Sequence, residues 1–300
     1  MIKPFLTYFR SNLWGHALAI YASNRLWQEV WLQAVRSRWA EVAAAIAFLW
    51  LLGLLGLSFV LLHLEQQALW LPAGVRALAH GLKASLAIAD ANADTSFSRW
   101  GLGLLGLGAW LCLVSGSQRL IRLVGVAYGS GTSRSASWRT RLLPWGLTLL
   151  GLGIVGLVLS LTGVETQPGL AEKIQRLGRW AIALASMTLG LAVVYRSSPR
   201  RWPSGLPLWP GVRLVLVLGL AELGLRYWGL AWLARQNLAY GLLLALGLNL
   251  VALYGLILLV PMGAQVNLST LRHRGARPGG SPPITTPPPS FESFKINRRD

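Results

Sequence analysis

The sequence predicts an all-α membrane protein, a polytopic bundle of six transmembrane helices preceded by an amphipathic helix. Of its 300 residues, 54% are apolar and only 13% are charged, and the mean hydropathy is +0.50. This charged fraction is about half that of a soluble globular protein. The chain also has 15 tryptophans and 33 glycines. Both suit a bilayer, because Trp settles at the headgroup level and Gly lets membrane helices approach closely.

Six apolar segments are long enough to cross a hydrocarbon core of roughly 30 Å, which requires about 20 helical residues. None shows the two-residue alternation of a barrel strand, and an open sheet cannot cross lipid with unpaired edges, so helices are expected. We place the spans at residues 42–62, 100–117, 142–163, 177–195, 209–233 and 238–262.

The spans divide the chain into three parts. Residues 1–41 mix Trp and Leu with Arg, which predicts an amphipathic helix on the inner membrane surface, with packing against the bundle as the alternative. Residues 42–267 form the membrane domain. Residues 268–300 are basic and rich in Pro, so we expect a disordered cytoplasmic tail that buries too little apolar surface to order itself.

The distribution of basic residues predicts the orientation. With six spans, 20 of the 28 Lys and Arg residues fall on the side of the two termini. Basic residues favour the cytoplasm, so both termini are expected there, in a bacterial inner membrane. The net charge of +18 then reflects topology and attraction to anionic headgroups, and we expect no nucleic-acid partner. Arg134, Arg139 and Arg141 are the candidate contacts to lipid phosphates.

Three polar residues stand out within the spans: Glu222, Arg226 and Asn249. An ionised group at bilayer depth costs at least about 2.5 kcal/mol, so Glu222 should face protein or water and have a partner. Arg226 lies four residues later on the same helix face and is the nearest candidate for an ion pair. These residues are either a polar centre on a substrate or proton path or a structural lock between helices.

Glycine clusters within the apolar segments are expected to mediate helix packing, since no Lys-Ser or Lys-Thr follows them as in a phosphate loop. They comprise Gly53, Gly56, Gly101, Gly103, Gly106, Gly108, Gly146, Gly151, Gly153 and Gly156. The single cysteine and four scattered histidines form no metal-ligand pattern. We therefore expect no enzyme activity, no metal and no cofactor.

Several motifs together resemble the YihY/BrkB family of bacterial inner-membrane proteins, whose members were once labelled ribonuclease BN. The resemblance covers roughly residues 25–267 and implies a six-span bundle without implying a molecular activity. Its most specific parts are Trp138-Arg-Thr-Arg-Leu-Leu143 at the start of the third span and the spacing from Pro210-Gly211 to Glu222. Further matches are Ala43 to Phe48, Arg122, Gly125-Val126, Tyr195-Arg196, Pro199, Tyr240-Gly241 and Gly263-Ala264.

The chain departs from this family pattern at several polar positions. Leu49, Ile121 and Gln265 stand where members usually have Tyr, Asn and an acidic residue. These losses suggest a divergent member with altered activity, or positions that only affect packing. Two functions remain open: movement of a lipid or small amphiphile across or within the bilayer, and a structural or scaffolding role in the envelope through protein partners.

Overall fold

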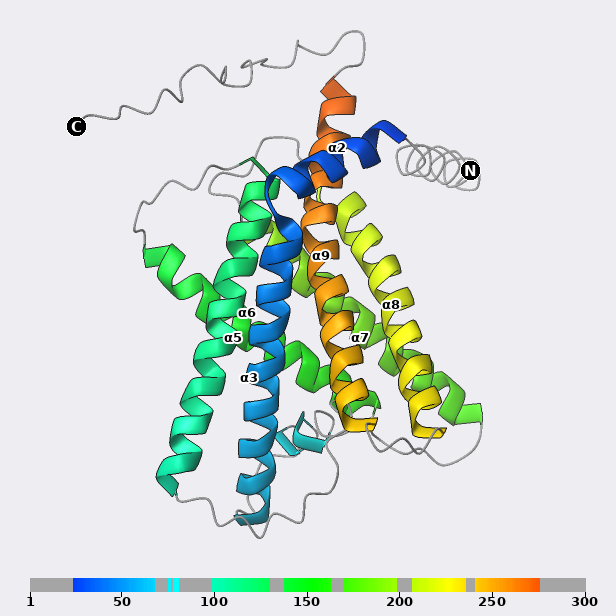
Figure 1. Ribbon diagram of the computed structural model, residues 1–300. Coiled ribbons are helices and arrows are strands. Elements are labelled where there is room, and N and C mark those ends of the chain that lie inside the picture. The colour runs from blue at the N-terminus through cyan, green and yellow to red at the C-terminus, as the bar shows by residue number, and fades with distance from the viewer. Residues whose placement is uncertain are drawn as a thin grey trace, which may run out of the picture.

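The computed structural model describes residues 24–67, 75–76, 78–80, 99–129, 138–162, 170–198, 207–235 and 241–275. These residues form helices and contain no strand, which confirms the predicted all-α class. The labelled helices are α2 (Asn24–Arg36), α3 (Trp39–Gln67), α5 (Arg99–Ala127), α6 (Trp138–Thr162), α7 (Leu170–Ser197), α8 (Trp209–Arg235) and α9 (Gly241–Gly275) (Figure 1).

Five of these helices, α3, α5, α7, α8 and α9, are long and apolar enough to cross a membrane. Helix α6 has 25 residues, but its described apolar run, Leu142–Leu157, is shorter than a full span. The predicted span at 142–163 therefore stays a prediction, while the other five coincide with membrane-length helices.

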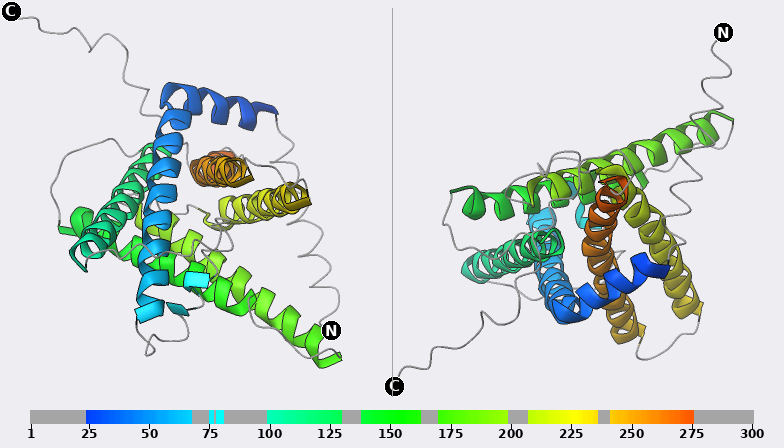
Figure 2. Two further views of the ribbon diagram at one scale, coloured as in Figure 1. Left: turned by 60° about the horizontal axis from the view of Figure 1, so that its bottom comes forward. Right: turned by 90° about the horizontal axis from the view of Figure 1, so that it is seen from above.

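The axes of α3, α5, α8 and α9 are roughly parallel, with α5 and α9 running opposite to α3 and α8, and α6 and α7 form an inclined layer on one side (Figures 1 and 2). The most extensive contacts join α3 to α5 and α8 to α9, and α3 also packs against α9. Helix α2 crosses one end of the bundle, beside the start of α3 and the end of α9 (Figure 1). Both ends of the described chain therefore lie at this α2 end.

A sharp turn separates α2 from α3. Arg38 has a φ of 51°, a left-handed conformation that is uncommon for a residue with a side chain. Its amide donates to the Val35 carbonyl at 3.2 Å, and the Ser37 amide donates to Gln33 at 3.0 Å. These bonds end α2 as a left-handed cap does, so the chain turns directly into α3.

Buried apolar side chains gather near the α2 end. Trp39 and Tyr195 are completely buried, and Leu26 and Val30 of α2 belong to the same cluster as residues of α5, α8 and α9. Helix α2 is thus packed on the bundle, which was the alternative to a purely surface position. The predicted segment 1–41 can be judged only from residue 24, because residues 1–23 lie outside the described part.

The expected glycine packing is confirmed for one pair of helices and wrong for much of α6. A Cβ at Gly53 or Gly56 of α3 would meet Leu113 or Ala109 of α5. By contrast, several glycines have open space within 4 Å of an added Cβ and make no close helix contact: Gly103, Gly108, Gly146, Gly151 and Gly153. Apolar context alone does not distinguish a contact glycine from an outward one.

Helix α9 extends beyond its predicted end at 262 and includes Pro261. Gln265, Asn267 and Thr270 lower the hydropathy there, but their side chains are buried in the bundle. The boundary expected at 267–268 is therefore wrong for the fold, since residues 268–275 continue the helix. The remainder of the predicted tail, residues 276–300, lies outside the described residues.

Candidate functional site

The candidate polar residues Glu222, Arg226 and Asn249 lie on the antiparallel pair α8 and α9. The register of this pair follows from its close contacts, in which an added Cβ at Gly219 would meet Leu256 and one at Gly229 would meet Leu248. The three polar residues thus occupy successive levels of one helix interface. We call them the charged centre.

Glu222 lies halfway along α8 and is half-buried. Its carboxylate rests against the backbone of α9 at Gly255, where an added Cβ would overlap the carboxylate oxygens. Only a residue without a side chain leaves this space, so Gly255 allows the carboxylate to lie between the two helices.

Arg226 and Asn249 are brought together across the same interface. The Arg226 Nε donates a hydrogen bond of 2.8 Å to Oδ1 of Asn249. The Asn249 amide nitrogen donates at 2.8 Å to the carbonyl of Ala245, one turn earlier in α9. The oxygen and the nitrogen of the buried Asn249 amide are therefore both hydrogen-bonded, and the amide orients the half-buried Arg226 guanidinium.

The expected ion pair between Glu222 and Arg226 is not among the ion pairs of the described residues. The expectation used spacing along one helix, but the helix register places Asn249 beside Arg226 and Gly255 beside Glu222. Within the described part of the chain, no hydrogen-bond or ion-pair partner of Glu222 is found. A carboxylate in this position is unfavourable unless it is protonated, hydrated or bound to a ligand.

A second polar cluster, which sequence reasoning did not identify as a site, lies nearer the α2 end. We call Tyr128, Tyr195, Gly211 and Asn267 the neutral centre. The Gly211 amide donates to Oδ1 of Asn267 at 2.7 Å, and Nδ2 of Asn267 donates to the Tyr128 hydroxyl at 3.3 Å. Asn267 thereby satisfies one of the free amides in the first turn of α8.

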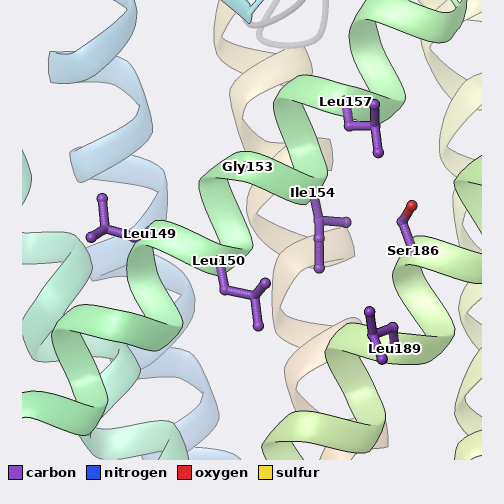
Figure 3. A pocket seen from close by; sticks show the side chains of 7 residues that line it. All are labelled: Leu149, Leu150, Gly153, Ile154, Leu157, Ser186 and Leu189. Carbon is purple, nitrogen blue, oxygen red and sulfur yellow. The ribbon is translucent and has the colours of Figure 1, made fainter.

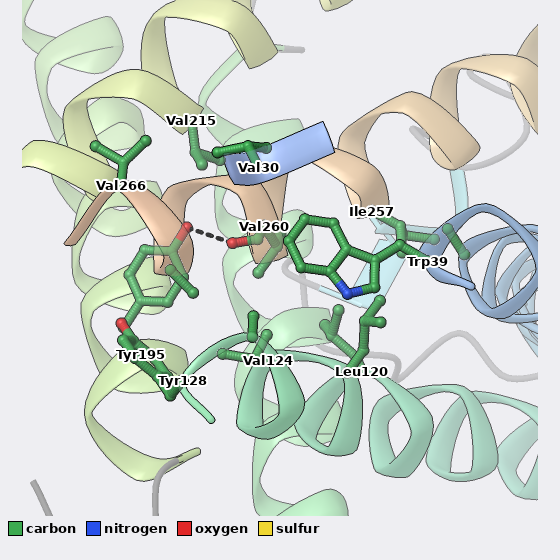
Figure 4. Packing of buried hydrophobic residues seen from close by; sticks show 14 of the residues in the cluster. Val30, Trp39, Leu120, Val124, Tyr128, Tyr195, Val215, Ile257, Val260 and Val266 are labelled. Atoms are coloured by element: carbon green, nitrogen blue, oxygen red, sulfur yellow. Dashed lines mark hydrogen bonds between the residues drawn. The ribbon is translucent and has the colours of Figure 1, made fainter. Parts of the chain in front are cut away.

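Tyr195 completes the neutral centre. Its hydroxyl donates to the carbonyl of Val260 at 2.9 Å, next to Pro261, and its ring meets that of Tyr128 edge to face with centroids 6.4 Å apart (Figure 4). Burial raises the pKa of Tyr128 to about 12, although the hydrogen bond from Asn267 opposes this, so the hydroxyl is neutral at physiological pH. Tyr195, Gly211 and Gly263 were part of the family resemblance, but nothing local in the sequence indicated that Tyr195 and Gly211 both lie against Gly263.

Bare backbone at two glycines makes this cluster possible. An added Cβ at Gly211 would overlap the carbonyl of Gly263, and one at Gly263 would overlap the Tyr195 hydroxyl. Beside the cluster, the Oε1 atom of Gln265 is buried and has no hydrogen-bond partner among the described residues. The neutral centre is thus densely packed and offers no space for a ligand at these contacts.

An apolar groove of about 570 Å³ lies between α6 and α7 (Figure 3). Its lining consists of Leu149, Leu150, Gly153, Ile154, Leu157, Ser186 and Leu189. The Ser186 hydroxyl donates to the Ile182 carbonyl of its own helix at 2.8 Å, so the lining offers essentially hydrocarbon. At its edge the helices touch where Ile154 packs over Gly190. The volume lies within the range of small-molecule pockets.

The candidate lipid-phosphate contacts cannot be placed. Arg134 and the side chains of Arg139 and Arg141 lie outside the described residues. Within the described part, no three His, Cys, Asp or Glu side chains are grouped as metal ligands would be. Leu49 and Ile121, the altered family positions, are half-buried on α3 and α5.

Comparisons with known proteins gave no match. No family model, no curated protein and no solved structure matches the chain. The resemblance to the YihY/BrkB family therefore remains a prediction from the motifs.

Proposed function

We propose that this chain is a multi-pass protein of the bacterial inner membrane that moves a lipid or small amphiphile across or within the bilayer. The main observation in support is that Glu222 is a half-buried carboxylate at the middle of α8 with no ion-pair partner among the described residues. Because such a group is costly at bilayer depth, its presence is better explained by a ligand or a proton than by packing.

The proposal assigns separate roles to two regions. Glu222 receives the cationic or proton-donating part of the transported molecule, while Arg226, held by Asn249, contacts an anionic part. The groove between α6 and α7 receives hydrocarbon, since its lining is almost entirely Leu and Ile. An amphiphile is the class of molecule that needs both.

The proposed topology has six spans with both termini cytoplasmic, as a divergent member of the YihY/BrkB family. The α2 end of the bundle gathers the start of α3 and the ends of α5 and α9, as expected for an even number of crossings (Figure 1). The sequence places most basic residues on this same side, which supports its cytoplasmic location. Anionic headgroups are the proposed lipid partners there.

Lipid translocation can be measured in vesicles containing the purified chain and a headgroup-labelled fluorescent phospholipid. Dithionite added outside bleaches outer-leaflet dye at once, so further loss reports movement from the inner leaflet. Wild type should increase this movement, and Glu222→Gln should abolish the increase. The matched control is Glu41→Gln, because Glu41 is an exposed carboxylate that lies 3.6 Å from Arg38. Equal rates for Glu222→Gln and wild type would contradict the proposal.

The groove is tested in the same assay by two glycine variants of α6. Neither Gly153 nor Gly151 has an atom within 4 Å of an added Cβ, but only Gly153 lines the groove. Gly153→Leu should fill the groove and slow translocation several-fold, while Gly151→Leu should not. Equal slowing by both variants would contradict a role for the groove in translocation.

The second candidate function is a structural or scaffolding role in the envelope. The dense packing around Gly211, Gly263 and Asn267 favours it, because such an end is built to be rigid. Under this alternative, wild-type vesicles translocate lipid no faster than protein-free vesicles, and Glu222→Gln complements a deletion strain fully.

A further inference from the structure

Helix α2 presents apolar side chains on two opposite faces. Leu26 and Val30 are buried in the core cluster. On the other face, Trp31, Leu32 and Val35 are 69%, 53% and 60% exposed. Residues three and four apart share a helix face, so these three form one continuous apolar patch. Packing on the bundle therefore accounts for only half of the apolar surface of this helix.

The outer face of α2 carries little charge at its centre. Among the α2 side chains that the structure describes, the exposed ones are Asn24, Gln28, Trp31, Leu32, Val35 and Arg36. Only Arg36 is charged, and it lies at the border of the face. Arg38 follows in the turn, with 75% of its side chain exposed. An uncharged, Trp-containing face flanked by Arg is typical of helices that lie in the membrane interface.

The contacts of α2 place it at the level where a membrane span ends. Glu29 accepts a hydrogen bond of 3.5 Å from the Ser269 hydroxyl of α9, whose candidate span extends to Leu271. Trp39, which follows the α2–α3 turn, begins the candidate span of α3. Seen along the bundle, α2 lies at the periphery, on the side away from α6 and α7 (Figure 2). Its outer face is thus at the level where the candidate spans of α3 and α9 begin and end.

We propose that the outer face of α2 is a binding surface for an anionic lipid leaflet. Trp31, Leu32 and Val35 enter the boundary between headgroups and acyl chains, while Arg36 and Arg38 contact lipid phosphates. Two observations favour lipid over a protein partner. The arginines complement anionic headgroups, and the following helix α3, a candidate membrane span, also exposes apolar side chains, including Phe48 and Leu52. The proposal does not depend on lipid translocation.

The experiment uses the full chain in vesicles, with Cys112 replaced by Ala so that one introduced cysteine carries an environment-sensitive dye. Val35→Cys reports the outer face, and Arg36→Cys is the matched neighbour, since successive residues are rotated by about 100° on a helix. The dye at 35 should emit at shorter wavelength and be quenched by lipids carrying a nitroxide near the top of the acyl chain. Because Arg36 lies at the border of the face, at the headgroups, a dye at 36 should emit at longer wavelength and be quenched less than the dye at 35.

Charge dependence is measured by comparing phosphatidylcholine vesicles with vesicles that also contain phosphatidylglycerol. The anionic lipid should strengthen quenching at 35, and Arg38→Gln should reduce that gain. Equal quenching in both vesicles would overturn the anionic specificity. A water-like signal at 35 in both would overturn lipid insertion. A third outcome is a dye at 35 that is shielded from water but not quenched by nitroxide lipids, in protein that elutes as a dimer. This outcome would assign the outer face to contact with a second copy of the chain instead.

Discussion

The two polar clusters on α8 and α9 differ in how completely their groups are satisfied. In the neutral centre, Asn267 is fully buried and links the Gly211 amide to the Tyr128 hydroxyl. In the charged centre, Asn249 is buried and satisfied, but Glu222 is half-buried and has no partner within the described chain. The same helix pair therefore has one saturated cluster and one incomplete cluster.

This difference separates polar residues that stabilise helix packing from those available for function. A buried polar group without a partner costs free energy, so a packed interface tolerates it only when something else compensates. The neutral centre compensates internally and needs no ligand. In the charged centre only Arg226 and Asn249 are hydrogen-bonded to each other. Glu222 is therefore the group through which this interface can respond to a proton or an amphiphile.

The largest expected effect on stability is at the glycine contact of the neutral centre. Gly211→Ala places a methyl group on the backbone of Gly263, which cannot rotate away as a side chain would. We expect a loss of about 3 kcal/mol, at the upper end for an overpacked core. Thermal unfolding in detergent measures it. The control is Gly224→Ala in the same helix, which has open space and should gain slightly from helix propensity.

A smaller effect is expected from removing either buried asparagine. Asn267→Leu leaves the Gly211 amide without its acceptor in a fully buried site, which should cost about 2 kcal/mol. Asn249→Leu should cost roughly half as much, because the half-buried Arg226 guanidinium can turn toward water. Unfolding midpoints of both variants test the contrast. Equal losses of stability would mean that the charged centre is as inaccessible to water as the neutral centre.

The sequence predicted those features that depend on composition along one helix. Long apolar runs identified the spans, and a single carboxylate among leucines identified Glu222. Features that depend on packing between helices were missed. Asn267 contacts Tyr128, which is 139 residues away in the sequence, and the polar residues around Asn267 in the sequence resemble those at a helix end. The expected Glu222–Arg226 pair is not among the ion pairs of the described residues, because Glu222 lies against Gly255 while Arg226 donates to Asn249. No spacing rule within α8 predicts this register with α9.

The smallest expected change in stability is at Glu222. A structural ion pair predicts that Glu222→Gln destabilises the protein and that adding Arg226→Leu restores it. The contacts predict otherwise. Since Glu222 has no ion pair among the described residues and an unpaired carboxylate is costly at this depth, Glu222→Gln should not lower the free energy of unfolding.

The double variant extends this test. Arg226→Leu removes the donor to Asn249, so it should destabilise the protein by a similar amount whether residue 222 is Glu or Gln. Additive effects are expected for side chains that form no ion pair with each other, and a coupling energy near zero would place the two residues in separate interactions. Recovery of stability in the double variant would indicate that Glu222 and Arg226 do form an ion pair in the wild type. It would also remove the main reason for assigning Glu222 a role in moving an amphiphile, because a paired carboxylate is explained by packing alone.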